Sequence, residues 1–485
     1  MRLPHTSLPT KISLAAAGLC AFSLWLGAIL AFVAVWLYTK EQPHAQKAEK
    51  TWLLIPLLLA PCIFLFNGTV PPDDLLRHLM AWKIDYQYPA QYPWSDLPKA
   101  NFWLGFDWAL GYLQVQWGVS SQVLLQAVPA LAFVLGGGVL YASMQKASPY
   151  ASPAAFVLLG LLGLALIAPR MFLGRPEAFI SIAAAAVWLC DTRAKIAAWV
   201  LLMLLCVPVY WLGWAYAPFA LLLPIAWRMR IGIAVFLAGA NLLFWQIYTG
   251  DYVAMMLWLK GTLSVQANEN ISMGALLLTY SGLVFALVLA AILARLPWTD
   301  LKRITFTHSF WTHRELGIAP LLLLLWLALP NQVRYSASIV FALLPWILQN
   351  VTRWELSNIE IQQPAWLRIP PFAMVAVLVI AGFHIQLAQE EIPRFAMPQG
   401  SKVFSENPYA TVFYAKEPIQ VEPSFALGAT KPQWKDLLNN KDTKLDCALV
   451  RQAGFTHVIE KSLSKRVECL ELSEIQGAWR LWRVR

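Results

Sequence analysis

Long apolar stretches alternate with short polar ones along most of the chain. Such stretches lie at about 12–38, 51–66, 121–145, 152–169, 177–190, 195–209, 213–227, 231–248, 274–294, 316–330, 335–350 and 370–388. A straight helix needs about 20 apolar residues to cross a bilayer, and several of these stretches are shorter. The pattern predicts an α-helical polytopic membrane protein with about twelve transmembrane helices over 1–388, and a first large external loop with amphipathic helices at 67–120.

The polar positions change character after residue 388. Short strand-like stretches lie at 402–404, 410–414, 455–459 and 479–484, with helical patterns at 434–439 and 448–454. A small external α/β domain over 389–485 fits this pattern. Cys447 and Cys469 would be able to pair there in an oxidising compartment, although the sequence does not set the distance between them.

Composition and charge agree with the membrane class. The chain is 59% hydrophobic and only 13% charged, too few charges to cover a soluble protein of 485 residues. Its net charge of +10 is spread over short loops. That distribution indicates cytoplasmic loops and contact with membrane lipids, and we expect no nucleic-acid partner. Counting basic residues in alternate loops places 67–120 and the C-terminal domain on the external face.

The first external loop opens with two acidic residues, Asp73 and Asp74, followed by Arg77 and His78. A carboxylate at the membrane edge would take a proton from an acceptor hydroxyl, and neighbouring cations would hold a phosphate. A structural interpretation competes with this one. Acids suit the first turn of a helix, and the two i,i+4 pairs that these four residues form would account for all of them.

Further polar residues lie in loops on the same predicted side. They are Lys99, Asn101 and Asp107 in the first loop, Arg175 and Glu177 in a short loop, and Arg334 and Tyr335 in another. Arginines at such positions also anchor helix ends, and the tryptophans around Asp107 are typical of membrane interfaces. Asp107 and Gly111 are four residues apart on a predicted amphipathic helix along the membrane surface.

Taken together, these residues resemble the GT-C superfamily of integral-membrane glycosyltransferases, including the protein mannosyltransferase and aminoarabinose transferase types. The resemblance consists of the acidic pair that opens a long external loop, Gly-Arg-Pro-Glu-Ala-Phe at 174–179, Arg334-Tyr335, and the small C-terminal domain. It implies inverting transfer of a hexosyl or pentosyl group from a polyprenyl-phosphate donor to an envelope acceptor: a pilin-like protein, lipid A or a polysaccharide. The implied location is the bacterial inner membrane, with the active site on the periplasmic face.

The resemblance also implies roles for individual residues. Asp74 or Asp73 would be the base, with Asp74 preferred, and Arg77, Arg175 and Arg334 would hold the leaving phosphate. The other expected substrate-binding residues are His78, Lys99, Asp107, Glu177 and Tyr335. No cofactor is required by such a reaction and no metal ligand is predicted, although an acidic pair is able to hold a divalent cation.

Two other functions fit the composition. A transporter or flippase would carry ionisable groups near the middle of its spans, and the apolar stretches here are almost free of charge. A non-catalytic envelope scaffold would use the C-terminal domain as its binding module.

Overall fold

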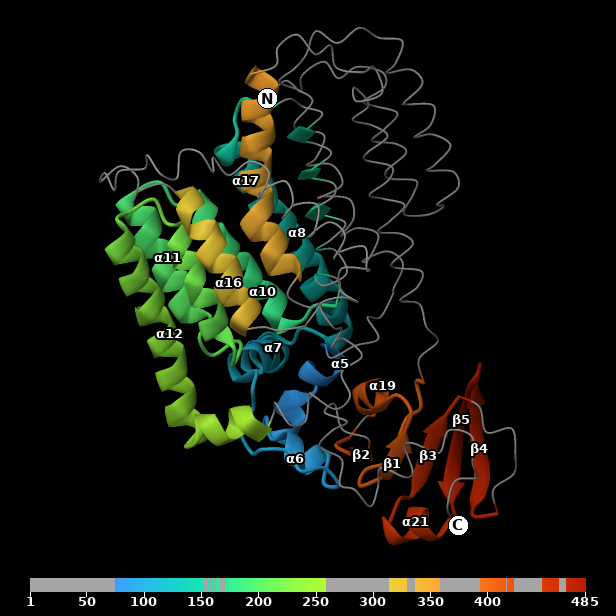
Figure 1. The fold of residues 1–485 in the computed structure, drawn as a ribbon. Helices are drawn as coiled ribbons and strands as arrows, with labels where there is room; N and C mark the ends of the chain where they lie inside the picture. Colours follow the sequence, from blue (N-terminus) through green and yellow to red (C-terminus); the bar gives the residue numbers. More distant parts are fainter. Residues whose placement is uncertain are drawn as a thin grey trace, which may run out of the picture.

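The computed structural model describes residues 75–151, 173–258, 314–328, 336–357, 393–415, 417–422, 447–461 and 468–485, and isolated positions between 155 and 171. Helices from 104 to 357 form one part of the molecule, and a five-stranded sheet from 402 to 484 forms another. Residues 75–103 lie between these two parts, with α5 at the lower end of α8 and beside α19 (Figure 1).

The chain between the two parts forms short elements, and longer helices follow. In chain order these are α5 (Leu75–His78), η2 (Ala81–Ile84), α6 (Tyr88–Gln91), α7 (Leu104–Trp117), α8 (Ser121–Ala147), α10 (Pro176–Ala185), η3 (Ala186–Leu189), α11 (Arg193–Leu205), η4 (Gly213–Leu222), α12 (Trp227–Thr249), η6 (Arg314–Gly317), α16 (Ile318–Ala328) and α17 (Ser336–Ser357). Side-chain caps begin two of them. Ser120 accepts from the Val123 amide at α8, and Thr192 accepts from the Lys195 amide at α11.

The predicted architecture of twelve transmembrane helices is wrong. Among the residues that the structure describes, only α8 and α12 are long and apolar enough to cross a membrane. The stretches at 177–190 and 195–209 contain α-helices of only 10 and 13 residues. At 1.5 Å per residue, 10 residues reach about 15 Å, half of a bilayer core of about 30 Å. The stretches at 12–38, 51–66, 274–294 and 370–388 lie outside the described residues.

The short apolar elements instead pack against one another. Residues 213–222, predicted as part of a span, form the 3-10 helix η4, which packs on α12, α16 and α10. Its Tyr216 and Phe219 are fully buried in the same core as Trp199 of α11 and Trp245 of α12. Large aromatic side chains bury about 150–250 Å² each and therefore contribute strongly to a protein core. Residues 213–222 have the hydropathy of a membrane span, but here they fill the protein interior.

Basic residues gather at one end of the helical part. Lys146 at the end of α8 forms an ion pair of 2.6 Å with Asp191, just before α11. Arg314 of η6 donates to the Trp188 carbonyl at 2.9 Å, and Arg230 of α12 donates to the Leu221 carbonyl at 2.9 Å. Because the helices alternate in direction, α5 and the start of α10 lie at the opposite end (Figure 1).

The C-terminal part is a sheet of parallel and antiparallel strands with two helices. Its elements in chain order are β1 (Lys402–Ser405), α19 (Pro408–Tyr414), β2 (Gln420–Glu422), α21 (Cys447–Gln452), β3 (His457–Glu460), β4 (Leu470–Gln476) and β5 (Trp479–Val484). The strand order is β2-β1-β3-β5-β4, with β1 parallel to β2 and β3, and β5 antiparallel to β3 and β4. In this register Phe404 faces Val458, and Val458 faces Trp482.

Most of the local predictions for this region are confirmed. Strands lie at 402–405, 457–460 and 479–484, and the predicted helix at 448–454 is α21, followed by Gly454 with a positive φ of 72°. The strand predicted at 410–414 is wrong, because these residues belong to α19. Pro408 in the first turn and the Asn407 side chain, which accepts from the Ala410 amide, begin that helix despite its β-branched residues. Residues 434–439 lie outside the described residues.

The segment 75–103 shares its core with the sheet. Tyr88 and Tyr92 are buried in one cluster with Val403 of β1 and Val421 of β2. Ser95 donates to the buried Glu422 carboxylate at 3.1 Å. Sheet and segment therefore form one packed unit, and the sheet contributes to the position of α5.

Cys447 and Cys469 form the disulfide that the sequence left open. It joins the start of α21 to the residue before β4, and the two cysteines are 22 positions apart in the sequence. Replacing both cysteines by serine should destabilise the C-terminal unit by about 2–4 kcal/mol, because the unfolded chain gains loop entropy. Limited proteolysis of the full chain should then cleave 393–485 faster than in the oxidised parent.

The parent chain treated with reductant is the matched control, and it should behave as the double variant does. Equal protease resistance of the oxidised parent and the double variant would show that the disulfide does not stabilise this unit.

Candidate functional site

The described residues of the helix that follows the acidic pair are all buried. α5 is described over Leu75–His78, and both Arg77 and His78 at its end are buried, with 0% and 1% of their surface exposed. Leu75 and Leu76 of the same helix pack against Leu125 of α8 and Ala410 of α19. These tertiary contacts hold the described part of α5 in place.

The Asp107 carboxylate is the centre of a buried hydrogen-bond network. Its Oδ1 lies 2.5 Å from Nδ1 of His78. Its Oδ2 accepts from the Tyr88 hydroxyl at 2.8 Å and from Nδ2 of Asn101 at 2.7 Å. Asp107 itself is fully buried. Three donors thus replace the water that this carboxylate loses on folding.

The Arg77 guanidinium completes this network. Its NH2 lies 3.4 Å from Nε2 of His78, and the group stacks over Trp103 at 4.3 Å and Tyr88 at 4.9 Å. His78 thus lies between the buried Arg77 guanidinium and the buried Asp107 carboxylate, in contact with both.

Burial also fixes the protonation of the tyrosine. Removal from water, together with the negative charge of Asp107, raises the pKa of Tyr88 well above its usual value. Tyr88 consequently remains a neutral donor to Asp107 throughout the physiological range of pH. The Tyr88 hydroxyl is therefore a constant part of this network.

The predicted spacing of Asp107 and Gly111 has a clear structural reason. Both residues lie on the buried face of α7. A Cβ at Gly111 would lie 2.5 Å from the hydroxyl of Tyr86 and 2.9 Å from Cβ of Trp82, so the absent side chain allows α7 to approach η2 closely. On this face, Asp107 supplies the carboxylate, and Gly111 allows the close contact with η2.

The loop with Arg175 and Glu177 reaches α5. A Cβ at Gly174 would lie only 2.8 Å from Cδ2 of Leu75, and Gly174 has a positive φ of 60°. Arg175 then precedes α10, and its NH1 lies 3.6 Å from Oε1 of Glu177 in the first helical turn. The residue that follows Asp74 in the chain thus lies beside the residue that precedes Arg175.

The start of α17 packs against α10. Oγ of Ser338 lies 2.8 Å from Oγ of Ser181, which also donates to the Glu177 carbonyl at 2.8 Å. The described part of α17 starts at Ser336, which follows Tyr335 in the chain. α10 therefore packs on α17, and the loop before α10 lies beside Leu75 of α5.

Lys99 lies in a different environment. Its side chain is exposed at an open hollow of about 280 Å³, which Asp251, Met255 and Trp258 also line. Lys99 is thus not part of the buried network around Asp107, and the structure does not bring these two predicted residues together.

The predicted residues Asp73, Asp74, Arg334 and Tyr335 lie outside the described residues. Tyr88 is a site residue that sequence reasoning missed, and nothing in its tyrosine-rich surroundings distinguishes it from its neighbours. Within the described ranges, no group of three or more His, Cys, Asp or Glu residues is placed to hold a metal ion.

Comparison of the chain with protein-family models, curated proteins and solved structures found no match.

Replacing Asp107 tests the network. Asp107→Leu should lower the free energy of unfolding by about 3–5 kcal/mol, because three buried donors lose their charged acceptor. Asp107→Asn retains one acceptor oxygen and should cost less, about 1–3 kcal/mol. Thermal unfolding of the purified full chain, followed by tryptophan fluorescence, measures both.

Glu474→Gln on the exposed strand β4 is the control with the same loss of charge, and it should change stability by no more than about 0.5 kcal/mol. If Asp107→Leu unfolds at the temperature of the Glu474 variant, Asp107 does not hold this part of the structure together.

Proposed function

We propose that this chain is a membrane-bound glycosyltransferase. It transfers a sugar from a polyprenyl-phosphate donor to an envelope acceptor, with inversion at the anomeric carbon. The reaction takes place beside α5, at the end of the helical part where α10 starts. Asp73 or Asp74 is the base, and Asp74 is preferred. The proposal rests on the residues around α5, independently of the number of membrane spans.

One observation carries the proposal. The residue after the acidic pair, Leu75, contacts Gly174, the residue before Arg175. A carboxylate pair and a phosphate-binding cation are the two groups that this transfer needs, and they occur in segments that meet in space. The Asp107 network makes this meeting point rigid, which favours a fixed geometry for reaction.

In the proposed reaction, the aspartate takes the proton of the acceptor hydroxyl. The acceptor oxygen forms a bond to the anomeric carbon, and the bond from that carbon to the phosphate oxygen breaks. The lipid phosphate leaves with the electron pair. Arg175 neutralises this phosphate, and Arg334 is its proposed second partner; such charge stabilisation lowers a barrier by several kcal/mol.

Arg77 and His78 receive a different role in this proposal. The Arg77 guanidinium is enclosed between Trp103 and Tyr88, and its whole side chain is buried. We assign both residues to positioning the helix that follows the acidic pair, with Asp107 as their anchor. Phosphate binding is left to Arg175, which precedes α10.

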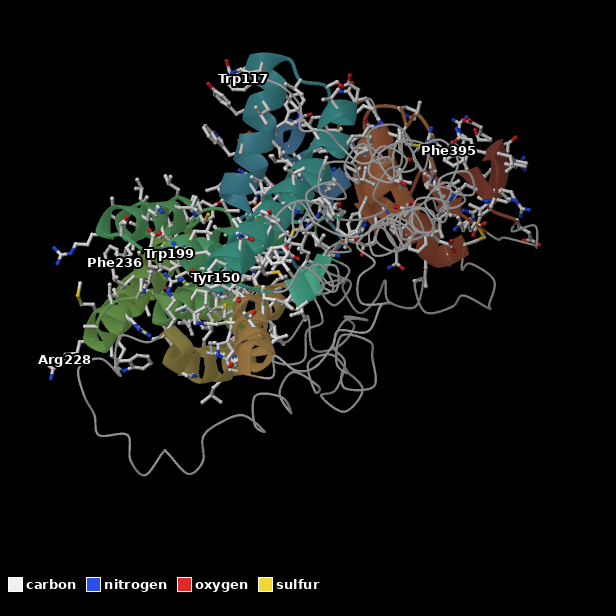
Figure 2. The ribbon with its side chains drawn as sticks, turned by 90° about the horizontal axis from the view of Figure 1, so that it is seen from above. Trp117, Tyr150, Trp199, Arg228, Phe236 and Phe395 are labelled. Carbon is white, nitrogen blue, oxygen red and sulfur yellow. A yellow bond between two sulfur atoms is a disulfide. The ribbon has the colours of Figure 1, made fainter. Side chains whose placement is uncertain are left out.

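The outer surface of the helices supports a membrane location. On α12, Val235, Phe236, Leu243 and Ile247 are exposed. In Figure 2, Phe236 lies at the outer side of α12, whereas Trp199 lies among the helices. The basic end with Lys146 and Arg230 would face the cytoplasm, in keeping with the usual distribution of positive charge.

Removing the acidic pair tests the base. Asp73→Asn or Asp74→Asn, whichever removes the base, should lower sugar transfer by about 10²–10⁴-fold with normal expression. Mass spectrometry of envelope proteins and glycolipids, from a deletion strain that carries each variant, measures the product. Glu474→Gln is the control with the same chemical change at a distant, exposed site. Full transfer by the double variant would refute the assignment of the base.

Replacing Arg175 tests the phosphate site. Arg175→Gln should raise the KM for the donor about 10–100-fold, since a hydrogen bond to a charged group contributes about 1.5–3 kcal/mol. Arg228→Gln is the matched control, because Arg228 is exposed at the opposite end of the helices and extends outward in Figure 2. Equal donor KM values for the two variants would exclude Arg175 from the phosphate site.

A further inference from the structure

The polarity of α7 is opposite to that of a helix on a water-exposed surface. Its buried face contains the charged Asp107. Its exposed face contains Trp108, Tyr112, Val115 and Trp117, with 55, 42, 55 and 69% of their surfaces exposed. A helix that faces water normally places its charges outside and its large apolar residues inside.

The surrounding sequence lacks the charges that an aqueous surface requires. From Ala100 to Gln145, Asp107 is the sole charged residue, and it is fully buried. The exposed surface of this segment is thus uncharged over the whole of α7 and nearly all of α8. Soluble surfaces have about a quarter to a third charged residues, so this surface does not suit water.

The aromatic residues on α7 form a continuous row. The rings of Trp108 and Tyr112 stack at 5.3 Å, and those of Tyr112 and Trp117 lie 6.3 Å apart. Tryptophan and tyrosine combine an apolar ring with a polar N–H or O–H group. They are enriched where hydrocarbon meets lipid headgroups, because that region accommodates both.

The position of α7 matches the depth of such an interface. α7 ends at Trp117 with Gly118 as its C-cap, and Ser120 caps α8, one of the two helices in the described part of the chain that are long enough to span a membrane. Figure 1 shows α7 nearly end-on while α8 runs along the picture, and in Figure 2 Trp117 lies at the edge of the molecule. Val123 and Leu131 of α8 are exposed apolar residues as well.

We propose that the exposed face of α7 inserts into the headgroup–acyl boundary of a phospholipid bilayer. The row from Trp108 to Trp117 contacts lipid, and the opposite face of the helix holds the Asp107 network above it. The membrane surface thereby sets the depth of α5. This inference needs contact with a membrane but no sugar transfer, so it stands or fails separately from the proposed enzyme.

A nitroxide label on α7 tests the proposal directly. The full chain with Val115→Cys is labelled and reconstituted in nanodiscs of phosphatidylcholine and phosphatidylglycerol. The spin label is then relaxed by oxygen, which concentrates in lipid, and by a water-soluble nickel chelate. Glu474→Cys on β4 is the water-exposed control, and the labelled parent chain gives the background from its native cysteines.

We expect the label at 115 to be more accessible to oxygen than to nickel, and the label at 474 to show the reverse. Gln116→Cys, exposed on the same helix, repeats the measurement if Val115→Cys does not fold. Nickel accessibility at 115 equal to that at 474 would overturn the proposal. Exclusion of both reagents would also overturn it, because a protein surface would then cover this face.

Discussion

The buried charge of Asp107 is the constraint on which the centre of this structure depends. A carboxylate without exposed surface must find its hydrogen bonds and its compensating charge inside the protein. His78, Tyr88 and Asn101 supply the hydrogen bonds, and the Arg77 guanidinium lies against the far side of His78. These four residues come from one irregular segment of the chain. Satisfying a single side chain of α7 therefore fixes the path of that whole segment, including the helix that follows the acidic pair.

The same segment connects the two parts of the molecule. On one side it meets α7 and α8, and on the other it shares a core with β1 and β2. Ser95 binds Glu422, and Trp94 donates to the carbonyl of Ala453, while α19 packs on α5. A change in the sheet would consequently act on α5 through packed side chains. The C-terminal unit thus has a structural role at the candidate site, whichever acceptor the site takes.

How far the sequence predicts this structure depends on the range of the interactions. Local patterns give α8, α12, β3, β5 and the helix before Gly454, because each depends on neighbouring residues. Hydropathy fails at η4, since the interior of a protein and the interior of a bilayer select the same residue types. It also gives no sign of the network: His78 and Asp107 are 29 residues apart, and nothing in the sequence identifies Tyr88 as their partner. Such pairings are set by tertiary packing.

Helix-start chemistry alone does not explain the residues around the acidic pair. Ion pairs at i,i+4 contribute about 0.2–0.5 kcal/mol each, and they act within helices that are already stable. The described part of α5 is buried and packs against α8 and α19. A buried ion pair of this kind is often no more stabilising than apolar residues of the same size, so stability is a weak reason for its presence. The network instead holds α5 in one position against the loop that contains Arg175. A reacting site requires such a fixed geometry.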